Sequence, residues 1–462
     1  MATRVDPVIF RQYDIRGTIG VDLTADAARA IGLAAGSEAR KRLGRAPTLA
    51  VGRDNRPSGE ELSAALIEGL AATGASVLSV GLVPTPTLYF AIHHLKADGG
   101  VQVTGSHNPP EFNGFKMVLE GLPFAGEDIQ ALRRRIEAGR FASGRGGVRS
   151  ETVIDAYRAE ILKRIGRLPR RVKVVVDCGN GTGSIVAPDL LEDLGAEVVR
   201  LFCESDGRFP NHHPDPTVLK NLVDLQDRVR ADRTELGIAF DGDADRIGAV
   251  DEHGTVLFGD QLLVLYGRDV VKRLGPGKEV IFDVKCSDVL AEALERAGAR
   301  PTMWMTGHSF IKKKMKETGA VLAGEMSGHM FFGPPDYLGF DDAMYAAARL
   351  LRIVADARAP VSSLLADLPK PVSTPEIRVD CPEDRKGPAV AAAAKYFGAR
   401  YPTVTIDGVR WRAPDGWGLI RQSNTQPILV LRFEARDAAA LERIRREAIE
   451  VLAREGVTVG AG

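Results

Sequence analysis

Thr48-Leu49-Ala50-Val51-Gly52-Arg53-Asp54 is the first of three similar segments that together decide the fold. It is typical of an apolar strand that enters a polar turn, and a helix-like stretch (59–73), a Gly-Ala pair and a strand (77–80) follow it. The pattern returns at 172–201 and again at 279–299. Helix-length connections between strands imply parallel pairing, with the Gly-Ala pairs at helix C-caps. The sequence therefore predicts three related α/β domains with layered sheets and helices.

Each repeat then reaches a further strand that ends in a polar loop. The three loops are Thr104-Gly105-Ser106-His107-Asn108-Pro109, Asp241-Gly242-Asp243-Ala244-Asp245-Arg246 and Gly324-Glu325-Met326-Ser327-Gly328-His329. Ligands bind at the carboxyl ends of the strands in α/β sheets. We therefore expect the three loops to close around one central cleft.

Two of these loops carry residues suited to phosphoryl chemistry. Ser106 stands in a tight, proline-terminated turn at a strand end, which is a favourable place for a nucleophile. Asp241, Asp243 and Asp245 occupy alternate positions and form a cage of hard oxygen ligands suited to Mg²⁺. A nucleophilic serine and a magnesium site together indicate phosphoryl transfer.

The last part of the chain differs from the repeats. From about Ser373 the pattern predicts a strand (376–380), a helix (387–397), a hairpin at Asp407-Gly408 and a final amphipathic helix, which is an α+β order. Arg421-Gln422-Ser423-Asn424-Thr425-Gln426-Pro427 supplies neutral and positive donors that suit a phosphate. We place the domains at residues 1–149, 150–252, 253–367 and 368–462.

Composition excludes several classes of function. Lys plus Arg equals Asp plus Glu, 61 each, so no global field attracts nucleic acid or an anionic membrane. The four cysteines are scattered without zinc spacing, which is typical of reduced thiols in a cytosolic protein. No apolar run reaches about 18 residues and the N-terminus has no signal-peptide core. We expect a cytoplasmic protein without a membrane span, and a monomer, since no strong exposed apolar pattern predicts a dimer.

Taken in order, these segments resemble the α-D-phosphohexomutase superfamily over essentially the whole chain, and within it the bacterial phosphomannomutase/phosphoglucomutase group. Phe10-Arg11-Gln12-Tyr13-Asp14-Ile15-Arg16-Gly17 is similar to the N-terminal signature of the family. Thr104–Pro109 resembles its phosphoserine loop, with Asn113-Gly114-Phe115-Lys116 downstream. The other three loops resemble, in chain order, its metal-binding, sugar-binding and phosphate-binding loops.

The resemblance implies a fold and a reaction. The fold is three related α/β domains with mixed sheets and a C-terminal α+β domain like the TATA-binding protein. The reaction moves phosphate between O1 and O6 of a hexose phosphate, with mannose, glucose or both as the sugar. Phosphoserine at Ser106 would give a hexose 1,6-bisphosphate, which would reorient and return its other phosphate to Ser106. One Mg²⁺ and the hexose 1,6-bisphosphate are the implied cofactors.

The resemblance also implies roles for individual residues. Asp241, Asp243, Asp245 and the phosphate on Ser106 would hold the Mg²⁺. The groups that would stabilise charge on the transferring phosphate are Arg16, His107, Lys116 and Arg246. His329 is the first candidate for the base that later acts as an acid, with Lys116 and His308 behind it. The implied substrate-binding set is Tyr13, Arg246, Lys285, His308, Glu325, Ser327, Arg421, Ser423, Asn424 and Thr425.

Two positions depart from the pattern of the family. Gly105 stands where alanine is usual, and we expect it to loosen the serine loop. Ala244 stands where glycine is usual, and if this position has a positive φ, alanine costs about 1 kcal/mol there. Neither departure removes a metal ligand or the nucleophile.

Other functions remain open at this stage. The aspartate triplet could form an EF-hand, but Arg246 stands where such a loop needs glycine and strands flank it. A Mg²⁺-dependent sugar-phosphate phosphatase would have no need of the second phosphate anchor in the fourth domain. A non-catalytic sugar-phosphate sensor would not need an intact Ser106. Phosphoglucosamine mutases usually carry glutamine where this chain has Met326.

Overall fold

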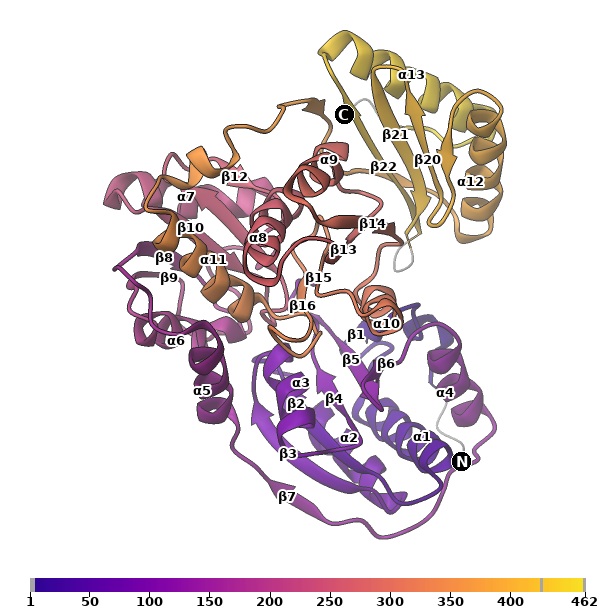
Figure 1. Ribbon diagram of the computed structural model, residues 1–462. Helices are drawn as coiled ribbons and strands as arrows, with labels where there is room; N and C mark the ends of the chain where they lie inside the picture. The colour runs from indigo at the N-terminus through magenta and orange to yellow at the C-terminus, as the bar shows by residue number, and fades with distance from the viewer. Residues whose placement is uncertain (1–4, 424–426, 460–462) are drawn as a thin grey trace.

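The computed structural model describes residues 5–423 and 427–459, and its strands form four separate sheets that follow one another along the chain (Figure 1). The first three sheets mix parallel and antiparallel pairs, and the fourth is antiparallel. This confirms the predicted order of three α/β domains and one α+β domain. The domain boundaries placed from the sequence stay predictions.

The first domain is built on a seven-stranded sheet in the order β1-β5-β4-β2-β3-β7, with β6 beside β5. Its two long helices pack against each other. After a 3₁₀ turn at Pro7–Ile9, its elements are β1 (Ile15–Thr18), α1 (Ala25–Leu43), β2 (Thr48–Arg53), α2 (Gly59–Ala72), β3 (Ser76–Leu82), α3 (Thr85–His94), β4 (Gly99–Val103), β5 (Phe112–Leu119), β6 (Leu122–Pro123), α4 (Glu127–Glu137) and β7 (Val148–Ser150).

The second and third domains have smaller sheets, in the orders β12-β11-β10-β8-β9 and β14-β13-β15-β16. The second contains α5 (Ile154–Ile165), β8 (Lys173–Asp177), a 3₁₀ turn (Thr182–Ile185), α6 (Ala187–Asp193), β9 (Glu197–Leu201), a 3₁₀ turn (Leu219–Leu222), α7 (Val223–Asp232), β10 (Leu236–Phe240), β11 (Ile247–Asp251) and β12 (Val256–Leu257). The third contains α8 (Gly259–Leu274), β13 (Glu279–Asp283), α9 (Asp288–Ala297), β14 (Arg300–Trp304), α10 (His308–Thr318), β15 (Leu322–Gly324), β16 (Met330–Phe332), α11 (Ala343–Ala357) and a 3₁₀ turn (Val361–Leu365).

One strand arrangement recurs in all three α/β domains and places the predicted loops. The first strand of each repeat (β2, β8 or β13) pairs in parallel with a later strand (β4, β10 or β15). That later strand then pairs with an antiparallel successor (β5, β11 or β16). Each predicted site loop connects these last two strands, so it lies at the carboxyl end of the parallel pair, where ligands bind in such sheets.

The fourth domain has an antiparallel sheet in the order β17-β22-β21-β20-β19, with β18 also beside β22. The predicted hairpin is confirmed, because Val404 faces Arg410 across it and Gly408 has a φ of +78°. The elements are β17 (Val372–Ser373), β18 (Ile377–Asp380), α12 (Glu383–Gly398), β19 (Thr403–Val404), β20 (Val409–Ala413), β21 (Gly416–Gln422), β22 (Ile428–Ala435) and α13 (Ala438–Arg454).

The helix predicted at 387–397 begins earlier, at Glu383, so its expected start was wrong. Pro388 does not stand in the first turn, where a proline would lose no hydrogen bond. The acidic pair Glu383 and Asp384 instead occupies the first turn, where the partial positive charge of the helix end favours carboxylates. The proline therefore lies inside the helix.

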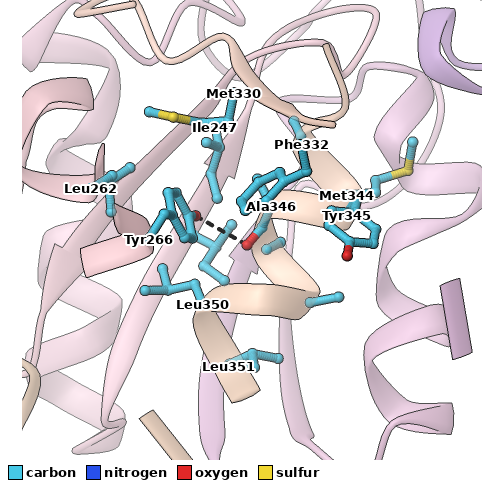
Figure 2. Close-up of a cluster of buried hydrophobic side chains, with 14 of the residues drawn as sticks. Ile247, Leu262, Tyr266, Met330, Phe332, Met344, Tyr345, Ala346, Leu350 and Leu351 are labelled. Atoms are coloured by element: carbon cyan, nitrogen blue, oxygen red, sulfur yellow. Dashed lines mark hydrogen bonds between the residues drawn. The ribbon is translucent and has the colours of Figure 1, made fainter. Parts of the chain in front are cut away.

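One hydrophobic core extends through the first three domains and fixes their positions relative to one another. The largest cluster of buried side chains joins Tyr89 of the first domain, Val174 of the second and most of α11 in the third. Figure 2 shows part of this cluster, where Leu350 of α11 lies near Tyr266, whose hydroxyl donates to the Ala346 carbonyl over 3.0 Å. The fourth domain has its own core, in which Trp411 stacks on Phe397 with 3.7 Å between ring centroids. Within the described ranges, none of the helices has the length and apolarity needed to cross a membrane.

Asp342, the N-cap of α11, supports a prediction about stability and pH. Its carboxylate accepts from the Tyr345 backbone N–H over 2.9 Å and from the Tyr157 hydroxyl over 2.8 Å. Burial outweighs these hydrogen bonds and raises the pKa of Asp342 to about 6. A raised carboxyl pKa means that the folded state favours the protonated form, so stability is lost as pH rises through 6. The penalty at pH 8 is about 3 kcal/mol and it shrinks as pH falls.

Asp342→Asn keeps a capping side chain but removes the buried charge. We expect the variant to unfold at a higher urea concentration than the wild type at pH 8, with the gain reduced by about half at pH 5. Asp437→Asn is the matched control, because Asp437 caps α13 in the same way but is exposed and has a lowered pKa. That control should lose stability at pH 8, and a loss for Asp342→Asn as well would contradict the prediction.

Candidate active site

Ser106 is held in a strained backbone conformation with its hydroxyl aimed at the second domain. Its φ is +50°, in the left-handed region that residues other than glycine rarely adopt. Its backbone N–H donates to Thr104 Oγ1 over 2.9 Å, and its side-chain oxygen lies 2.8 Å from Asp241 Oδ2 and 3.1 Å from His107 Nδ1. The structure therefore brings together the predicted nucleophile and the first predicted metal ligand, which lie on different domains.

A buried arginine that sequence analysis missed holds this loop. The Arg56 guanidinium is fully buried and donates to the carbonyls of Ser106 (2.7 Å), Asn108 (2.5 Å) and Pro109 (2.6 Å). Asp54 pairs with it over 3.1 Å and also accepts from the Gly105 backbone N–H over 3.0 Å. The guanidinium has five donors in a rigid fork, whereas a lysine has three and could not make all of these bonds.

Gly105 is explained by the same arginine. A Cβ at this position would lie 2.5 Å from the Arg56 Cζ and 2.8 Å from the Phe112 carbonyl oxygen. The glycine thus lets the guanidinium pack against the loop backbone, and the expectation that it loosens the loop was wrong. Ala244 does have a positive φ, +58°, as considered from the sequence.

The three predicted metal ligands lie together at the end of β10. Asp241, Asp243 and Asp245 are all fully buried, and their ligand oxygens lie within 4.8 Å of one another. Burial and the two neighbouring carboxylates raise the pKa of Asp241 well above its usual range. Like charges this close in a low dielectric need a cation or a proton to offset them.

Lys116 of β5 is the cation that the chain supplies. Its Nζ lies 2.7 Å from Asp243 Oδ2 and 2.5 Å from Asp245 Oδ2, and those carboxylates outweigh burial and raise its pKa. Although burial opposes the effect, Lys116 and His329 hold the pKa of Asp245 well below its usual range. The first domain therefore neutralises much of the charge that the second domain buries.

The carboxylate group also fits a divalent cation. Among the described residues, Asp243 Oδ1 is a buried oxygen without a hydrogen-bond partner, and Asp245 Oδ1 has only an ion pair with His329. Oxygen-only donors of this kind suit a hard ion such as Mg²⁺. The group could therefore bind a metal ion, with the Ser106 oxygen adjacent.

The predicted sugar-binding loop forms a tight turn between β15 and β16. The Glu325 backbone N–H donates to the His329 carbonyl over 2.9 Å. Gly328 has a φ of +93°, and a Cβ there would also meet the Ile247 carbonyl oxygen at 2.3 Å, so both the conformation and the space require glycine. The Ile247 N–H also donates to the Gly328 carbonyl over 3.0 Å. This contact fixes the loop of the third domain against the metal loop of the second.

His329 lies between two buried carboxylates. Its Nδ1 is 2.8 Å from Glu325 Oε2, and its Nε2 is 3.2 Å from Asp245 Oδ1. Although burial opposes it, Asp245 and Glu325 raise the pKa of His329 to about 9. His329 and Lys285 in turn overcome burial and lower the pKa of Glu325 to about 2. The two carboxylates therefore favour the imidazolium, the state that donates protons, and Arg246, whose Nε lies 3.3 Å from His329 Nε2, opposes them.

Other predicted residues surround this centre. Arg16 of β1 donates to Asn108 Oδ1 over 3.1 Å, and burial together with Arg246 and Arg16 lowers the pKa of His107 well below its usual range. Ser327 Oγ lies 3.2 Å from His329 Nδ1. The Tyr13 hydroxyl donates to the Thr306 carbonyl over 2.9 Å.

The structure describes only part of the predicted phosphate-binding loop of the fourth domain. Arg421 is buried and donates from Nε to Asp407 Oδ2 over 2.9 Å, and the same oxygen accepts from the Thr306 backbone N–H of the third domain over 2.9 Å. Asp407 was predicted from the sequence only as a hairpin residue, not as a residue of the site. Lys285 Nζ lies 3.3 Å from Glu376 Oε2, at the junction of the third and fourth domains. Ser423 is described, whereas Asn424 and Thr425 lie outside the described residues.

Comparison with known proteins matches all of these domains in order. Four models of the phosphoglucomutase/phosphomannomutase family match: alpha/beta/alpha domain I at residues 7–143, domain II at 155–254, domain III at 258–372 and the C-terminal domain at 376–451. The chain belongs to the phosphoglucomutase/phosphomannomutase family. It is a member of the α-D-phosphohexomutase superfamily, as its loops indicated.

Individual relatives of this phosphoglucomutase/phosphomannomutase family member cover nearly the whole chain. "Phosphomannomutase/phosphoglucomutase" of Pseudomonas aeruginosa strain PAO1 is 51% identical over 95% of this chain and 94% of its own. "Phosphoglucomutase" of Neisseria gonorrhoeae is 48% identical over 95% of both. A crystal structure of a phosphoglucomutase/phosphomannomutase family protein from Burkholderia thailandensis superposes with a TM-score of 0.89 at 46% identity, covering 97% of this chain and 98% of that one.

The Arg56 contacts predict a large effect on stability. Arg56→Met would leave the Asp54 carboxylate buried without its partner. The carbonyls of Ser106, Asn108 and Pro109, and that of Phe112, would lose their donor, so we expect a loss of about 3–5 kcal/mol in unfolding free energy. Adding Asp54→Asn should recover part of this loss, because the uncompensated charge is then gone. Arg53→Met is the control, since Arg53 is only half-buried and donates to one carbonyl. Thermal unfolding of the four proteins measures the effect, and equal losses for Arg53→Met and Arg56→Met would contradict it.

Proposed function

We propose that this protein is a phosphohexomutase that interconverts hexose 1-phosphates and hexose 6-phosphates, with mannose and glucose as the sugars. The observation that carries the proposal is the Ser106 hydroxyl, 2.8 Å from a buried carboxylate of a trio that Lys116 partly neutralises. Phosphoryl transfer needs positioning and charge neutralisation more than covalent help from the protein. The identity of 48–51% to curated relatives named for these reactions supports the choice of substrates.

In the proposed reaction, Ser106 carries a phosphoryl group that it transfers and later regains. A bond forms between phosphorus and a sugar hydroxyl oxygen, the bond from phosphorus to the Ser106 oxygen breaks, and the hydroxyl proton goes to a base. The hexose 1,6-bisphosphate so formed reorients in the site. Its other phosphoryl group is then transferred to the Ser106 oxygen, and the sugar oxygen that loses it accepts a proton. His329, protonated between Glu325 and Asp245, suits this second proton transfer as an acid.

Several side chains would stabilise charge or hold the substrate. Lys116, Arg16, His107 and Arg246 surround the Ser106 oxygen or the carboxylate trio and would offset charge on the transferring group. Glu325 and Ser327 would hydrogen-bond sugar hydroxyls, with Lys285 and His308 on the other side. Arg421, Ser423, Asn424 and Thr425 would grip the phosphate that is not reacting, and Tyr13 would support the loop of His308. Contacts to a sugar that binds in two orientations must use features that both share.

Asp241, Asp243 and Asp245 would hold one Mg²⁺ together with the phosphate on Ser106. Such an ion offsets negative charge on phosphoryl oxygens and so favours the transfer. Hexose 1,6-bisphosphate serves as intermediate and activator in this proposal. We further propose that the protein works as a cytoplasmic monomer on small sugar phosphates rather than on nucleic acid.

The alternatives fit less well. A phosphatase would leave the buried Arg421 without a phosphate to bind. A phosphoglucosamine mutase usually has glutamine where Met326 lies, and here the Met326 sulfur contacts the Arg432 guanidinium of the fourth domain. Glucose and mannose differ only in the configuration of the hydroxyl at carbon 2. A pocket that makes no contact with that hydroxyl would accept both sugars.

Ser106→Ala tests the proposal directly. The wild type, given glucose 1-phosphate or mannose 1-phosphate with Mg²⁺ and a trace of the matching bisphosphate, should form hexose 6-phosphate without releasing free phosphate. Ser106→Ala should lower kcat by at least about 10³-fold, because it removes the nucleophile. Ser37→Ala, a buried serine of α1 remote from the site, should leave kcat unchanged. Release of free phosphate alone would instead identify a phosphatase, and full turnover by Ser106→Ala would exclude both enzymes.

Removal and return of the metal make a second test. Mg²⁺ that binds only the folded state at about 100 times its Kd should stabilise the protein by about 3 kcal/mol, because it offsets repulsion within the carboxylate trio. Asp243→Asn should lose most of this stabilisation, whereas Asp251→Asn, outside the trio at the end of β11, should keep it. Thermal unfolding after chelation and after addition of Mg²⁺ measures both, and equal Mg²⁺ responses in the two variants would contradict the assignment.

A further inference from the structure

His308 presents its two ring nitrogens to different surroundings. It is the first residue of α10, and its ring stacks on His329 with 5.6 Å between centroids. Nδ1 is sealed from solvent and has no hydrogen bond within the described ranges. Nε2 makes no hydrogen bond there either, but it is not among the buried unpaired atoms, so it reaches accessible space. The ring therefore offers Nε2, not Nδ1, to a ligand.

A buried carboxylate faces the sealed nitrogen. Asp341 Oδ2 lies 3.4 Å from His308 Nδ1, and neither atom has a hydrogen-bond partner in the described part of the chain. The other oxygen, Oδ1, accepts from Lys312 Nζ over 2.8 Å. Lys312 is itself fixed, with its Nζ 4.3 Å above the Tyr89 ring. Asp341 therefore turns one oxygen to the lysine and the other to the histidine.

The surroundings keep His308 neutral and decide which nitrogen carries its proton. Burial, followed by Lys312, His329 and Lys116, lowers the pKa of His308 well below its usual range, and Asp245 opposes this only in part. The N-terminal end of α10 also disfavours a cation. A neutral imidazole has a single N–H, and an ionised carboxylate can only accept. The proton therefore belongs on Nδ1, where Asp341 can accept it, and Nε2 keeps its lone pair.

We propose that Asp341 is a positioning residue that holds His308 in the Nδ1-protonated tautomer, so that Nε2 accepts a hydrogen bond from a sugar hydroxyl. The substrate part of this inference rests on the proposed function. An Nε2 without a proton cannot donate to a phosphate oxygen, so His308 can accept a hydrogen bond from a sugar hydroxyl but cannot bind a phosphate through Nε2. If a hydroxyl proton transfers to Nε2, the O–H bond breaks and Asp341 stabilises the resulting imidazolium, as carboxylate–histidine pairs do in other enzymes.

Asp341→Asn should reverse the tautomer for a geometric reason. Lys312 has only donors, so it pairs with the amide oxygen of the new side chain. The amide NH₂ group then faces His308. Nδ1 must then accept, and the ring proton moves to Nε2. An Nε2–H cannot accept from a hydroxyl, so kcat/KM should fall by about 100-fold or more.

The test is nitrogen NMR of ¹⁵N-histidine-labelled, ligand-free protein, with the His308 signals assigned by their loss in His308→Gln. We expect wild-type His308 to show a protonated Nδ1 and an unprotonated Nε2, unchanged between pH 6 and 8, and Asp341→Asn to show the reverse. Asp336→Asn is the matched control, because Asp336 is a buried carboxylate of the same β16–α11 connection that binds Arg273 instead. It should leave the His308 signals and kcat/KM unchanged.

The outcomes separate this inference from the proposed function. A wild-type His308 that is protonated on Nε2, or on both nitrogens, would overturn the inference whatever the enzyme does, and this measurement needs no variant of Asp341. Retention of the wild-type tautomer in folded Asp341→Asn would overturn it as well. Absence of mutase activity in the wild type would overturn the proposed function, while the tautomer would still be decided by the spectrum.

Discussion

Three carboxylates buried on one short loop are the constraint around which the rest of the structure is arranged. Asp241, Asp243 and Asp245 repel one another in a medium where such repulsion is poorly screened. The loop itself carries only one cation, Arg246, so the neighbouring domains supply others. Lys116 comes from the first domain and His329 from the third. Charge neutralisation thus joins three domains at one point, and the shared core of those domains holds the partners in place.

Two strained backbone positions also lie at this point. Ser106 and Ala244 both have positive φ values, on loops that face each other across the first two domains. At Ser106 the strain is held by four hydrogen bonds from the Arg56 guanidinium to the backbone of residues 106–112. At Ala244 the strain costs about 1 kcal/mol, but its fully buried methyl group returns about 0.8 kcal/mol, so alanine is nearly neutral there. A departure from the usual glycine therefore need not weaken the loop.

Much of this arrangement could be predicted from the sequence, because the informative residues are contiguous. The three site loops each follow an apolar strand, so their position at the sheet edge follows from the repeat alone. Arg56, Asp341 and Asp407 could not be found in this way. Arg56 stands in a polar turn, where an arginine is usually solvated, and nothing local indicates that it is buried. Asp341 contacts His308, which lies 33 positions away in the sequence. Asp407 contacts Arg421 and Thr306, which lie 14 and 101 positions away. No sequence motif links either aspartate to its partners.

The fourth domain is attached in a different manner from the other three. The hydrophobic cluster that joins it to the third domain is small, with Val284, Trp417 and Leu419. Charged contacts supply much of the rest: Arg410 pairs with Asp288 over 2.8 Å and also donates to the Cys286 carbonyl over 2.8 Å. Polar interfaces of this kind can open and close again without exposing a large apolar surface.

Asp407 links this interface to the phosphate site that we propose. The same carboxylate oxygen accepts from Arg421 of the fourth domain and from the Thr306 N–H of the third. A phosphate that binds Arg421 must share the guanidinium with Asp407 or displace it. Displacement would free the carboxylate and weaken a contact between the two domains, whereas sharing would use the remaining donors of the guanidinium and leave the contact intact. Displacement therefore couples substrate binding to the docking of the fourth domain through one side chain, and by linkage each then affects the other equally.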